Sequence, residues 1–461
     1  MSVSANAVPR AAPRLPLPLV LAYASGSIGT AAFIIVPQLL LLFFMTDVLA
    51  VPPAWAAAAL FVPKLWEFLT DPIIGAASDR LETPWGRRRP MMLIGAILFT
   101  GTFWMMFSVP DFDDWPARFL WVAILFALCT TAYTVYSVPY IAMPAEMTDG
   151  YDERTRIVSF RMVFVSIGVL LAGTLAPGIV AATGGGREGY AMMGGTFAAL
   201  CGGVMLVSVI GTRSAVFTTR SDRSLTAIEQ VRLGLANRPF RVLWIAFVVQ
   251  MVSIAISTAV LPYFAKYQLG GGEALVTAFF LVFTLGTLAS MPAWVALAGR
   301  MGKRDAFALS TVLQAIGATF LFWTPGLSPA AFLVGAAVMG VGNAGVQMFP
   351  FAMLPDVIDE DRRRTGLNRE GAFTGIWIAG EKLGLAIGAA VIGLALSIAR
   401  FEEGAGSVVS QPDAALLTIR LGMSVGPAAI LILSLTMLSR YTEPNDSPTV
   451  RTTAPLQGET R

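Results

Sequence analysis

Apolar runs of about 20 residues recur along the whole chain, and short polar or charged connections separate them. A helix of that length crosses a bilayer core about 30 Å thick. The pattern predicts an all-α membrane protein with twelve transmembrane helices. The candidate spans are approximately 19–46, 53–78, 90–109, 117–147, 158–182, 190–211, 241–265, 274–298, 305–324, 330–354, 372–398 and 414–438.

The connections between the spans alternate in charge. One set is poor in basic residues, and the other holds Arg80, Arg87, Arg88, Arg89, Arg154, Arg156, Arg213, Arg220, Arg223, Arg232, Arg300, Lys303, Arg304, Arg362, Arg363, Arg364 and Arg369. Loops rich in Lys and Arg stay on the cytoplasmic side of a membrane. We therefore predict a multi-pass protein of the plasma (inner) membrane with both termini in the cytoplasm and a first span that is retained.

Composition supports a membrane protein and narrows its chemistry. Of 461 residues, 56% are hydrophobic and 13% are charged, against about 25% charged in soluble proteins. Histidine is absent, so proton chemistry must use carboxylates, Lys, Arg or Tyr. No phosphate loop, metal-ligand cluster, nucleophile–base pair or nucleic-acid surface is visible. We expect no enzyme activity, no cofactor beyond a coupling ion and no nucleic-acid partner.

The two halves of the chain repeat each other. SVPYIAMPAEMTDGYDER, from Ser137, parallels MFPFAMLPDVIDEDRRR, from Met348, with prolines at the same spacing. GAASDRLETPWGRRR and WVALAGRMGKRD are a weaker echo. Repeated halves of six helices indicate the major facilitator fold, with two pseudo-symmetric bundles and a solute site near the midplane. The predicted parts are bundles at 1–211 and 241–440, a cytoplasmic linker at 212–240 and a disordered tail at 441–461.

The second predicted span carries two carboxylates, Glu67 and Asp71. They are four residues apart and therefore share one helical face, which Lys64 also occupies. Asp71 lies about 12 Å from the cytoplasmic end of the helix at 1.5 Å per residue. Charges at that depth are costly unless they face a wet cavity or a partner. Two repelling carboxylates favour a shared proton or a bound cation. Alternatively, the three residues form an ion triad that only holds helices together.

Several motifs in order resemble the glycoside–pentoside–hexuronide:cation symporters, the melibiose-permease type of major facilitator. They are DPIIGAASDRLETPWGRRRP, VPYIAMPAEMTDGYDERTR, LPYFAKYQLGG and GLNREGAFTGIW, and the resemblance covers nearly the whole chain. It implies alternating access and solute uptake coupled to Na⁺, Li⁺ or H⁺.

The resemblance also implies a cation site, with Glu67 and Asp71 in the positions of the family's paired acids and Lys64 one turn earlier. Thr70 stands where some members have an amide, and Thr134 matches a hydroxyl ligand. The site would hold Na⁺ at Glu67 and Asp71. Glu67 is one methylene longer than the more usual Asp, which leaves Na⁺ and H⁺ open as coupling ions.

On the solute side, Arg161 and Lys382 match family residues near the sugar, although Arg161 could instead be a snorkelling arginine. Where melibiose-type sites use acids, this chain has Ala31 and Ser137, so a galactoside site of that kind is not expected. The cavity would suit another glycoside, a uronide or an amphipathic molecule. The predicted solute-binding residues are Arg161, Lys382, Lys64, Tyr133, Ser137 and Trp377.

The cytoplasmic motifs predict a charge network that stabilises one conformational state. An alternative is that these charges only fix topology. The predicted gating residues are Asp79, Arg80, Arg87, Arg88, Glu146, Asp149, Arg154, Asp356 and Arg364.

Together these features predict a secondary active transporter for cation symport of a glycoside, sugar or sugar acid. A transporter of a lysolipid-like solute on the same fold, and a solute receptor without flux, are the alternatives. The expected partners are a small-molecule solute, a coupling cation and the lipid bilayer, and we expect a monomer.

Overall fold

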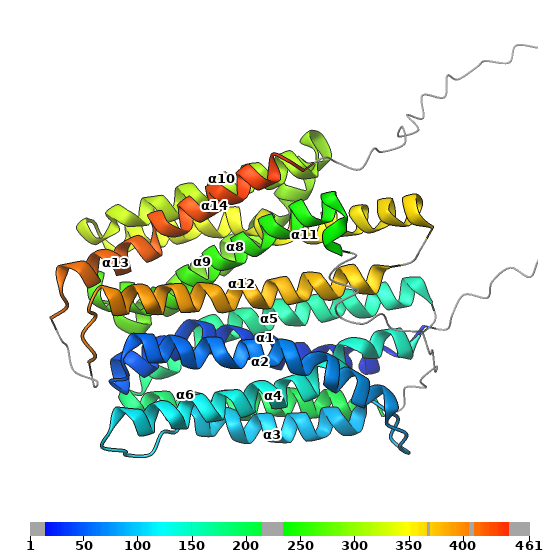
Figure 1. Ribbon diagram of the computed structural model, residues 1–461, viewed down its shortest axis with the longest axis horizontal. Helices are drawn as coiled ribbons and strands as arrows, with labels where there is room; N and C mark the ends of the chain where they lie inside the picture. The colour runs from blue at the N-terminus through cyan, green and yellow to red at the C-terminus, as the bar shows by residue number, and fades with distance from the viewer. Residues whose placement is uncertain (1–13, 149, 214–233, 367–368, 405–409, 442–461) are drawn as a thin grey trace, which may run out of the picture.

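The computed structural model describes residues 14–148, 150–213, 234–366, 369–404 and 410–441. Within these residues the regular structure is entirely helical, and the long helices lie side by side along one axis (Figure 1). The predicted linker at 212–240 and tail at 441–461 fall largely outside the described residues, and the predicted division into parts stays a prediction.

The first set of helices runs from α1 to α6. Four of its α-helices start with proline in the first turn, where its missing N–H removes no intrahelical bond. The elements are α1 (Leu17–Val36), the π-helical turns η1 (Pro37–Leu41) and η2 (Phe44–Val48), α2 (Pro53–Arg80), α3 (Arg89–Phe107), α4 (Trp115–Met147), α5 (Tyr151–Ala182) and α6 (Gly186–Gly211).

The second set runs from α8 to α14. Side chains of Asn237 and Ser328 cap α8 and α11 by accepting backbone hydrogen bonds at 3.1 and 3.4 Å. The elements are α8 (Arg238–Tyr263), the π-helical η3 (Phe264–Gln268), α9 (Gly272–Met301), α10 (Lys303–Phe320), the 3₁₀ turn η4 (Leu321–Gly326), α11 (Pro329–Thr365), α12 (Glu370–Ile398), α13 (Asp413–Met423) and α14 (Val425–Leu438).

Eleven of the helical segments in the described residues are long and apolar enough to cross a membrane, one fewer than the twelve predicted. The segment that falls short is α2, because Lys64, Glu67 and Asp71 lower its apolar character. It is 28 residues long and packs between α4 and α12 in the body of the molecule. The predicted span 414–438 is broken into α13 and α14 at Ser424, three residues before Pro427. Helix α11 runs on past the predicted residue 354 to Thr365.

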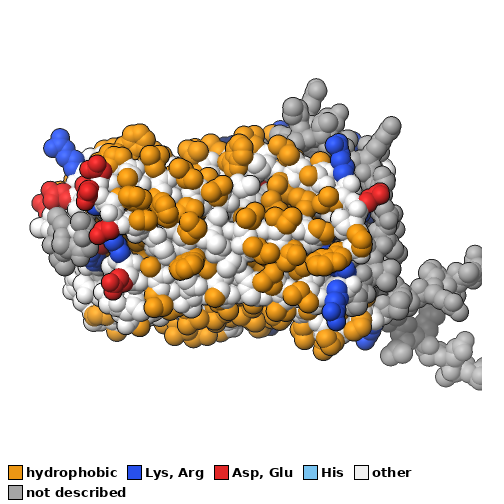
Figure 2. Space-filling model, turned by 90° about the horizontal axis from the view of Figure 1, so that it is seen from below, with side chains coloured by type: hydrophobic (Ala, Val, Ile, Leu, Met, Phe, Trp, Pro, Cys, Tyr) orange, Lys and Arg blue, Asp and Glu red, His pale blue; other side chains and the backbone are white. Residues whose placement is uncertain are grey.

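Charged side chains gather at the two ends of the molecule, and apolar side chains cover its flanks (Figure 2). We call one end the Arg-rich end, because α2 ends and α3 and α10 begin there; it carries Arg80, Arg87, Arg88, Arg89, Lys303 and Arg304. The other, which we call the far end, carries more acidic side chains, including Asp111, Asp113, Asp114, Glu402 and Glu403. An apolar flank between two polar ends fits a protein that spans a bilayer.

The two sets of helices are joined most closely toward the far end. One apolar core there includes residues of both sets, whereas the Arg-rich half of the second set has a separate core. Helix α12 approaches α2 so closely that a Cβ at Gly393 would meet Ala57 at 2.5 Å. The contact between the sets therefore seals the far end more than the Arg-rich end.

Candidate cation and solute site

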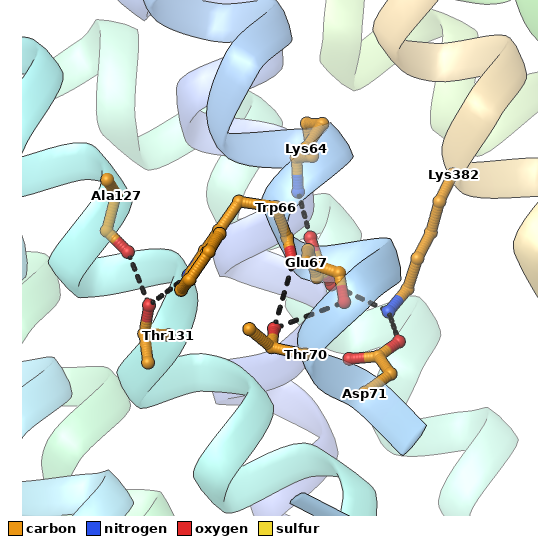
Figure 3. Close-up of polar contacts among 8 residues, drawn as sticks. All are labelled: Lys64, Trp66, Glu67, Thr70, Asp71, Ala127, Thr131 and Lys382. Carbon is orange, nitrogen blue, oxygen red and sulfur yellow. Dashed lines mark hydrogen bonds and ion pairs between the residues drawn. The ribbon is translucent and has the colours of Figure 1, made fainter. Parts of the chain in front are cut away.

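The two acids of α2 meet two lysines, one from α2 and one from α12 (Figure 3). Lys64 Nζ lies 3.1 Å from Glu67 Oε2, one helical turn along α2. Lys382 reaches across from α12, with its Nζ 2.7 Å from Glu67 Oε1 and 2.5 Å from Asp71 Oδ2. Two carboxylates and two ammonium groups therefore form one cluster, and Lys382 bridges the two acids.

This arrangement differs from the triad that sequence spacing alone allowed. Lys64 pairs with Glu67, but the partner of Asp71 comes from the second set of helices. The side chain of Glu67 is 1% exposed and that of Asp71 is 27% exposed. The deeper acid thus has two ammonium partners, while the more accessible acid has one.

Hydroxyl groups flank the acids. Thr70 Oγ1 donates to the carbonyls of Trp66 and Glu67 at 3.1 and 3.2 Å, which leaves its oxygen able to accept or to bind a cation. Within the described residues, Asp71 Oδ1 and Thr134 Oγ1 are buried and make no well-formed hydrogen bond, and the Thr134 hydroxyl lies close enough to the Asp71 carboxylate for a weak one. Unpartnered buried oxygens are uncommon in native proteins, so these atoms suit a ligand.

Three of the predicted solute-binding residues, Tyr133, Ser137 and Trp377, lie in different surroundings. Tyr133 is 6% exposed, stacks on Phe33 at 4.3 Å between ring centroids and lies in the field of the acid cluster. Ser137 is also buried, on the same helix. Trp377 is 1% exposed and stacks on Phe247 at 4.3 Å, inside the core of the second set. Of these three residues, Tyr133 is therefore the one that the structure brings to the acid cluster.

Arg161 of α5 is partly buried, and its guanidinium lies 5.9 Å from the centre of the Tyr140 ring. Its Nε atom is buried without a hydrogen-bond partner. A snorkelling arginine would place its head group among water or lipid head groups. The ring contact and the buried nitrogen indicate instead a guanidinium held inside the protein.

At the Arg-rich end, four of the predicted gating residues of the first set form a network in which Arg88 and Glu146 are buried and Asp79 is exposed. Arg88 donates to Glu146 Oε1 at 2.9 Å and pairs with Asp79 at 2.6 Å. Arg87 pairs with the same Glu146 oxygen at 2.9 Å. Arg88 also donates to Ser78 at 2.9 Å, a contact that sequence reasoning missed. The network joins α2, the loop before α3 and α4.

The other predicted gating residues are more exposed or stand apart. Asp356 of α11 pairs with Lys303 at 2.6 Å, and both side chains are largely exposed. Arg80 and Arg364 are exposed near the ends of α2 and α11. Arg154 has a buried Nε without a hydrogen-bond partner. Asp149 lies outside the described residues.

The structure adds a polar contact at the far end that sequence reasoning missed. Lys266 of η3 pairs with Asp47 of η2 at 2.6 Å, and Tyr267 also donates to Asp47. Thr46 and Tyr263 share a hydrogen bond at 2.6 Å beside them. The sequence does show an acid near the end of the first span, Asp47, and a Lys-Tyr pair near the end of the seventh, Lys266 and Tyr267. Nothing in the sequence indicates that these residues meet.

The comparisons with known proteins show the family and the fold of this chain. The family model for MFS/sugar transport proteins matches residues 22–443. A crystal structure of a D-xylose-proton symporter superposes with a TM-score of 0.66 at 14% identity, over 94% of this chain and 99% of that chain. The fold is that of a major facilitator transporter, as the sequence predicted. The protein is a multi-pass membrane transporter rather than an enzyme, and it belongs to the MFS/sugar transport protein family.

Two of the relatives have names that describe a transport activity. A putative glycoside/cation symporter of Escherichia coli (strain K12) is 28% identical over 87% of this chain and 86% of the relative. A sodium-dependent lysophosphatidylcholine symporter of Danio rerio is 23% identical over 86% of this chain and 80% of the relative. The first of these confirms the resemblance to glycoside:cation symporters.

Proposed function

We propose that this chain is a cation-coupled symporter for a small polyhydroxylated solute, a glycoside or a sugar acid. It works by alternating access in an inner membrane, with both termini in the cytoplasm. The observation that carries the proposal is Lys382 of α12 bridging Glu67 and Asp71 of α2. The two acids can bind a proton or a cation, and Lys382 links them to the contact between the two sets of helices.

The cluster gives a physical route to coupling. Lys382 and a coupling cation compete for the same carboxylate oxygens, because Lys64 and Lys382 already balance the charge of the two acids and a further cation must displace one ammonium group. A cation at Glu67 and Asp71 releases Lys382 toward the solute, and departure of the cation draws Lys382 back. Ion occupancy thereby changes both the solute site and the contact between α2 and α12, as linkage between two ligands requires.

The donor set fits a monovalent cation. Two carboxylates, the hydroxyls of Thr70 and Thr134, and the Phe68 carbonyl, which Pro72 deprives of its helical donor, are hard oxygen ligands of the kind that Na⁺ accepts. The same acids would carry a proton if H⁺ is the coupling ion. Among the described residues, no group of three His, Cys, Asp or Glu residues gathers into a multivalent metal site.

The closing contacts support alternating access. In this structure the two sets are joined toward the far end by Asp47, Lys266 and a shared apolar core. Opening at that end requires these contacts to break, while contacts form at the Arg-rich end. Two-state contacts of this type are how transporters switch.

The test uses full-length protein in proteoliposomes with an imposed Na⁺ or H⁺ gradient and a panel of radiolabelled glycosides and uronates. We expect uphill accumulation with one of the two ions by the wild type. Asp71→Asn should abolish accumulation and retain exchange of solute between the two sides. Glu273→Gln, at the start of α9 and away from the cluster, is the matched control.

Uphill uptake by Asp71→Asn at the wild-type level would contradict the proposed cation site. Flux of lysophospholipids with no flux of any sugar would instead favour an amphipathic solute on the same fold, the class named for the Danio rerio relative.

A further inference from the structure

One carboxylate inside the membrane-spanning part of the molecule has no role in the cluster described above. Glu381 of α12 directly precedes Lys382, so its side chain leaves the helix about 100° away from the lysine. No hydrogen bond or ion pair joins it to another described residue. It is partly exposed, and the charges of Lys382 and Arg161 act on it.

After the charges of the cluster are paired, Glu381 and Arg161 remain without an ion-pair partner among the described residues. Lys64 and Lys382 are satisfied by Glu67 and Asp71, which makes that cluster neutral. Arg161, from the first set of helices, contacts the Tyr140 ring but has no carboxylate partner in the described part of the chain. An acid of the second set and a base of the first set are therefore close enough for their charges to act on each other, and no hydrogen bond or ion pair joins them.

The acids expected of a melibiose-type sugar site are missing from the first set. Ala31 is 4% exposed and packs against α5, where a Cβ at Gly168 would meet its methyl at 2.9 Å. Ser137 is 3% exposed. Neither position supplies the strong hydroxyl acceptor that a carboxylate provides. A carboxylate at membrane depth also needs a partner, and solute hydroxyls would provide one.

We propose that Glu381 accepts hydrogen bonds from solute hydroxyls opposite Arg161, and that it makes the transporter select neutral glycosides over sugar acids. This inference rests on the proposed function and narrows its solute class. A uronate carboxylate drawn toward Arg161 or Lys382 would lie near the Glu381 carboxylate, and two like charges at short range repel. A neutral glycoside offers hydroxyl donors to Glu381 and acceptors to Arg161 without that repulsion.

The test compares two sugars that differ only at C6. Binding of methyl β-D-glucoside and methyl β-D-glucuronide to purified full-length protein is measured by thermal shift and calorimetry, with the galactoside and galacturonide as a second pair. We expect the wild type to bind the neutral sugar of each pair about tenfold more tightly. Glu381→Gln should bring the ratio close to one, since it removes a charged acceptor worth about tenfold in affinity.

Two variants guard the interpretation. Glu381→Asp keeps the negative charge and should retain the preference for neutral sugars, whereas a purely structural role would be disturbed by either change. Glu273→Gln removes a carboxylate elsewhere and should leave the ratio unchanged. The melting temperature without ligand shows whether each variant is folded.

The outcomes separate this inference from the proposed function. An unchanged ratio in Glu381→Gln, or a wild type that prefers the glucuronide, overturns the role of Glu381 and leaves cation symport standing. A wild type that binds neither sugar of either pair, and moves none in proteoliposomes, overturns the proposed solute class and the role of Glu381 with it.

Discussion

In the first set of helices, the loop before α3 places Arg88 between Asp79 of α2 and Glu146 of α4. In the second set, the matching loop ends at Gly302, and the first residue of α10, Lys303, lies beside Asp356 of α11. The loops share a glycine with positive φ, Gly86 at 83° and Gly302 at 92°. Their charges nevertheless lie in different surroundings. The side chains of Arg88 and Glu146 are 9% and 8% exposed, whereas those of Lys303 and Asp356 are 46% and 43% exposed.

A one-residue shift accounts for the difference. The carboxylate follows Pro144 by two residues in the first set, as Glu146, and follows Pro355 by one residue in the second, as Asp356. One residue turns a helical side chain by about 100°, from the face between helices to the solvent. The matching position in the second set is Val357, which is 1% exposed in an apolar core. The repeat thus keeps its backbone while one copy buries its charges.

The largest effect is expected from Glu146→Gln. It leaves the buried guanidinium of Arg88 with one fewer anionic partner and Arg87 without one, and removing one partner of a buried pair destabilises by about 3–5 kcal/mol. The melting temperature in detergent should fall by several degrees. Retention of the wild-type melting temperature would show that the buried network contributes no more than the exposed one.

Arg88→Lys should have a smaller effect. Lysine keeps the positive charge but cannot reach Glu146, Asp79 and Ser78 at once, because it lacks the planar fork of donors. We expect a loss of about 1–3 kcal/mol, read from the same unfolding experiment. Arg300→Lys, on an exposed arginine at the same end of the molecule, is the control and should not change the melting temperature.

Asp356→Asn in the second set should lower the stability by less than about 1 kcal/mol, because exposed ion pairs are weak and screened by salt. The sensitivity to salt should also differ. Raising NaCl should remove the difference between Asp356→Asn and the wild type but leave most of the effect of Glu146→Gln. Equal salt dependence in the two variants would contradict the contrast in burial.

The smallest change is expected from exchanging the two charges of the exposed pair. Lys303→Asp with Asp356→Lys keeps an ion pair at the surface and should stay within about 0.5 kcal/mol of the wild type. Lys303→Asp alone places two like charges together and should be less stable than the exchanged pair. Unfolding of all three proteins in one detergent makes the comparison, and a strong loss in the exchanged protein would mean that Lys303 has a further role.

The sequence predicted much of the fold because apolar runs report burial in lipid directly. Eleven spans follow from hydropathy, and α2 was recognised although its charges weaken that signal. The break at Ser424 was not predicted because it lies inside a continuous apolar run. The extension of α11 to Thr365 was not predicted because residues 355–365 are mostly charged and therefore resemble a connection between spans. The acids of α2 were also found, because charges in an apolar run are conspicuous.

The partners of those acids were harder to predict. Spacing placed Lys64 with Glu67 and Asp71 on one helix face. The side chain that bridges the acids, however, is Lys382, which lies 311 residues beyond Asp71 in the sequence. Aromatic residues were ambiguous for the same reason. Tyr133 reaches the acid cluster, whereas Trp377 packs inside the second set. A residue type predicts what a side chain is able to do and leaves open which neighbour it meets.

The amino-acid sequence by itself determined a membrane-spanning helical protein with two repeated halves and an ionisable centre in its second span. Those properties depend on composition and on periods of a few residues, which are local. Tertiary structure alone decided that Lys382 joins the acids, that the charge of Arg161 acts on Glu381, and that Asp47 meets Lys266. These contacts join helices that are hundreds of residues apart in the sequence. A shift of one residue along a helix is enough to move a side chain from a buried face to an exposed one, as the comparison of Glu146 with Asp356 demonstrates.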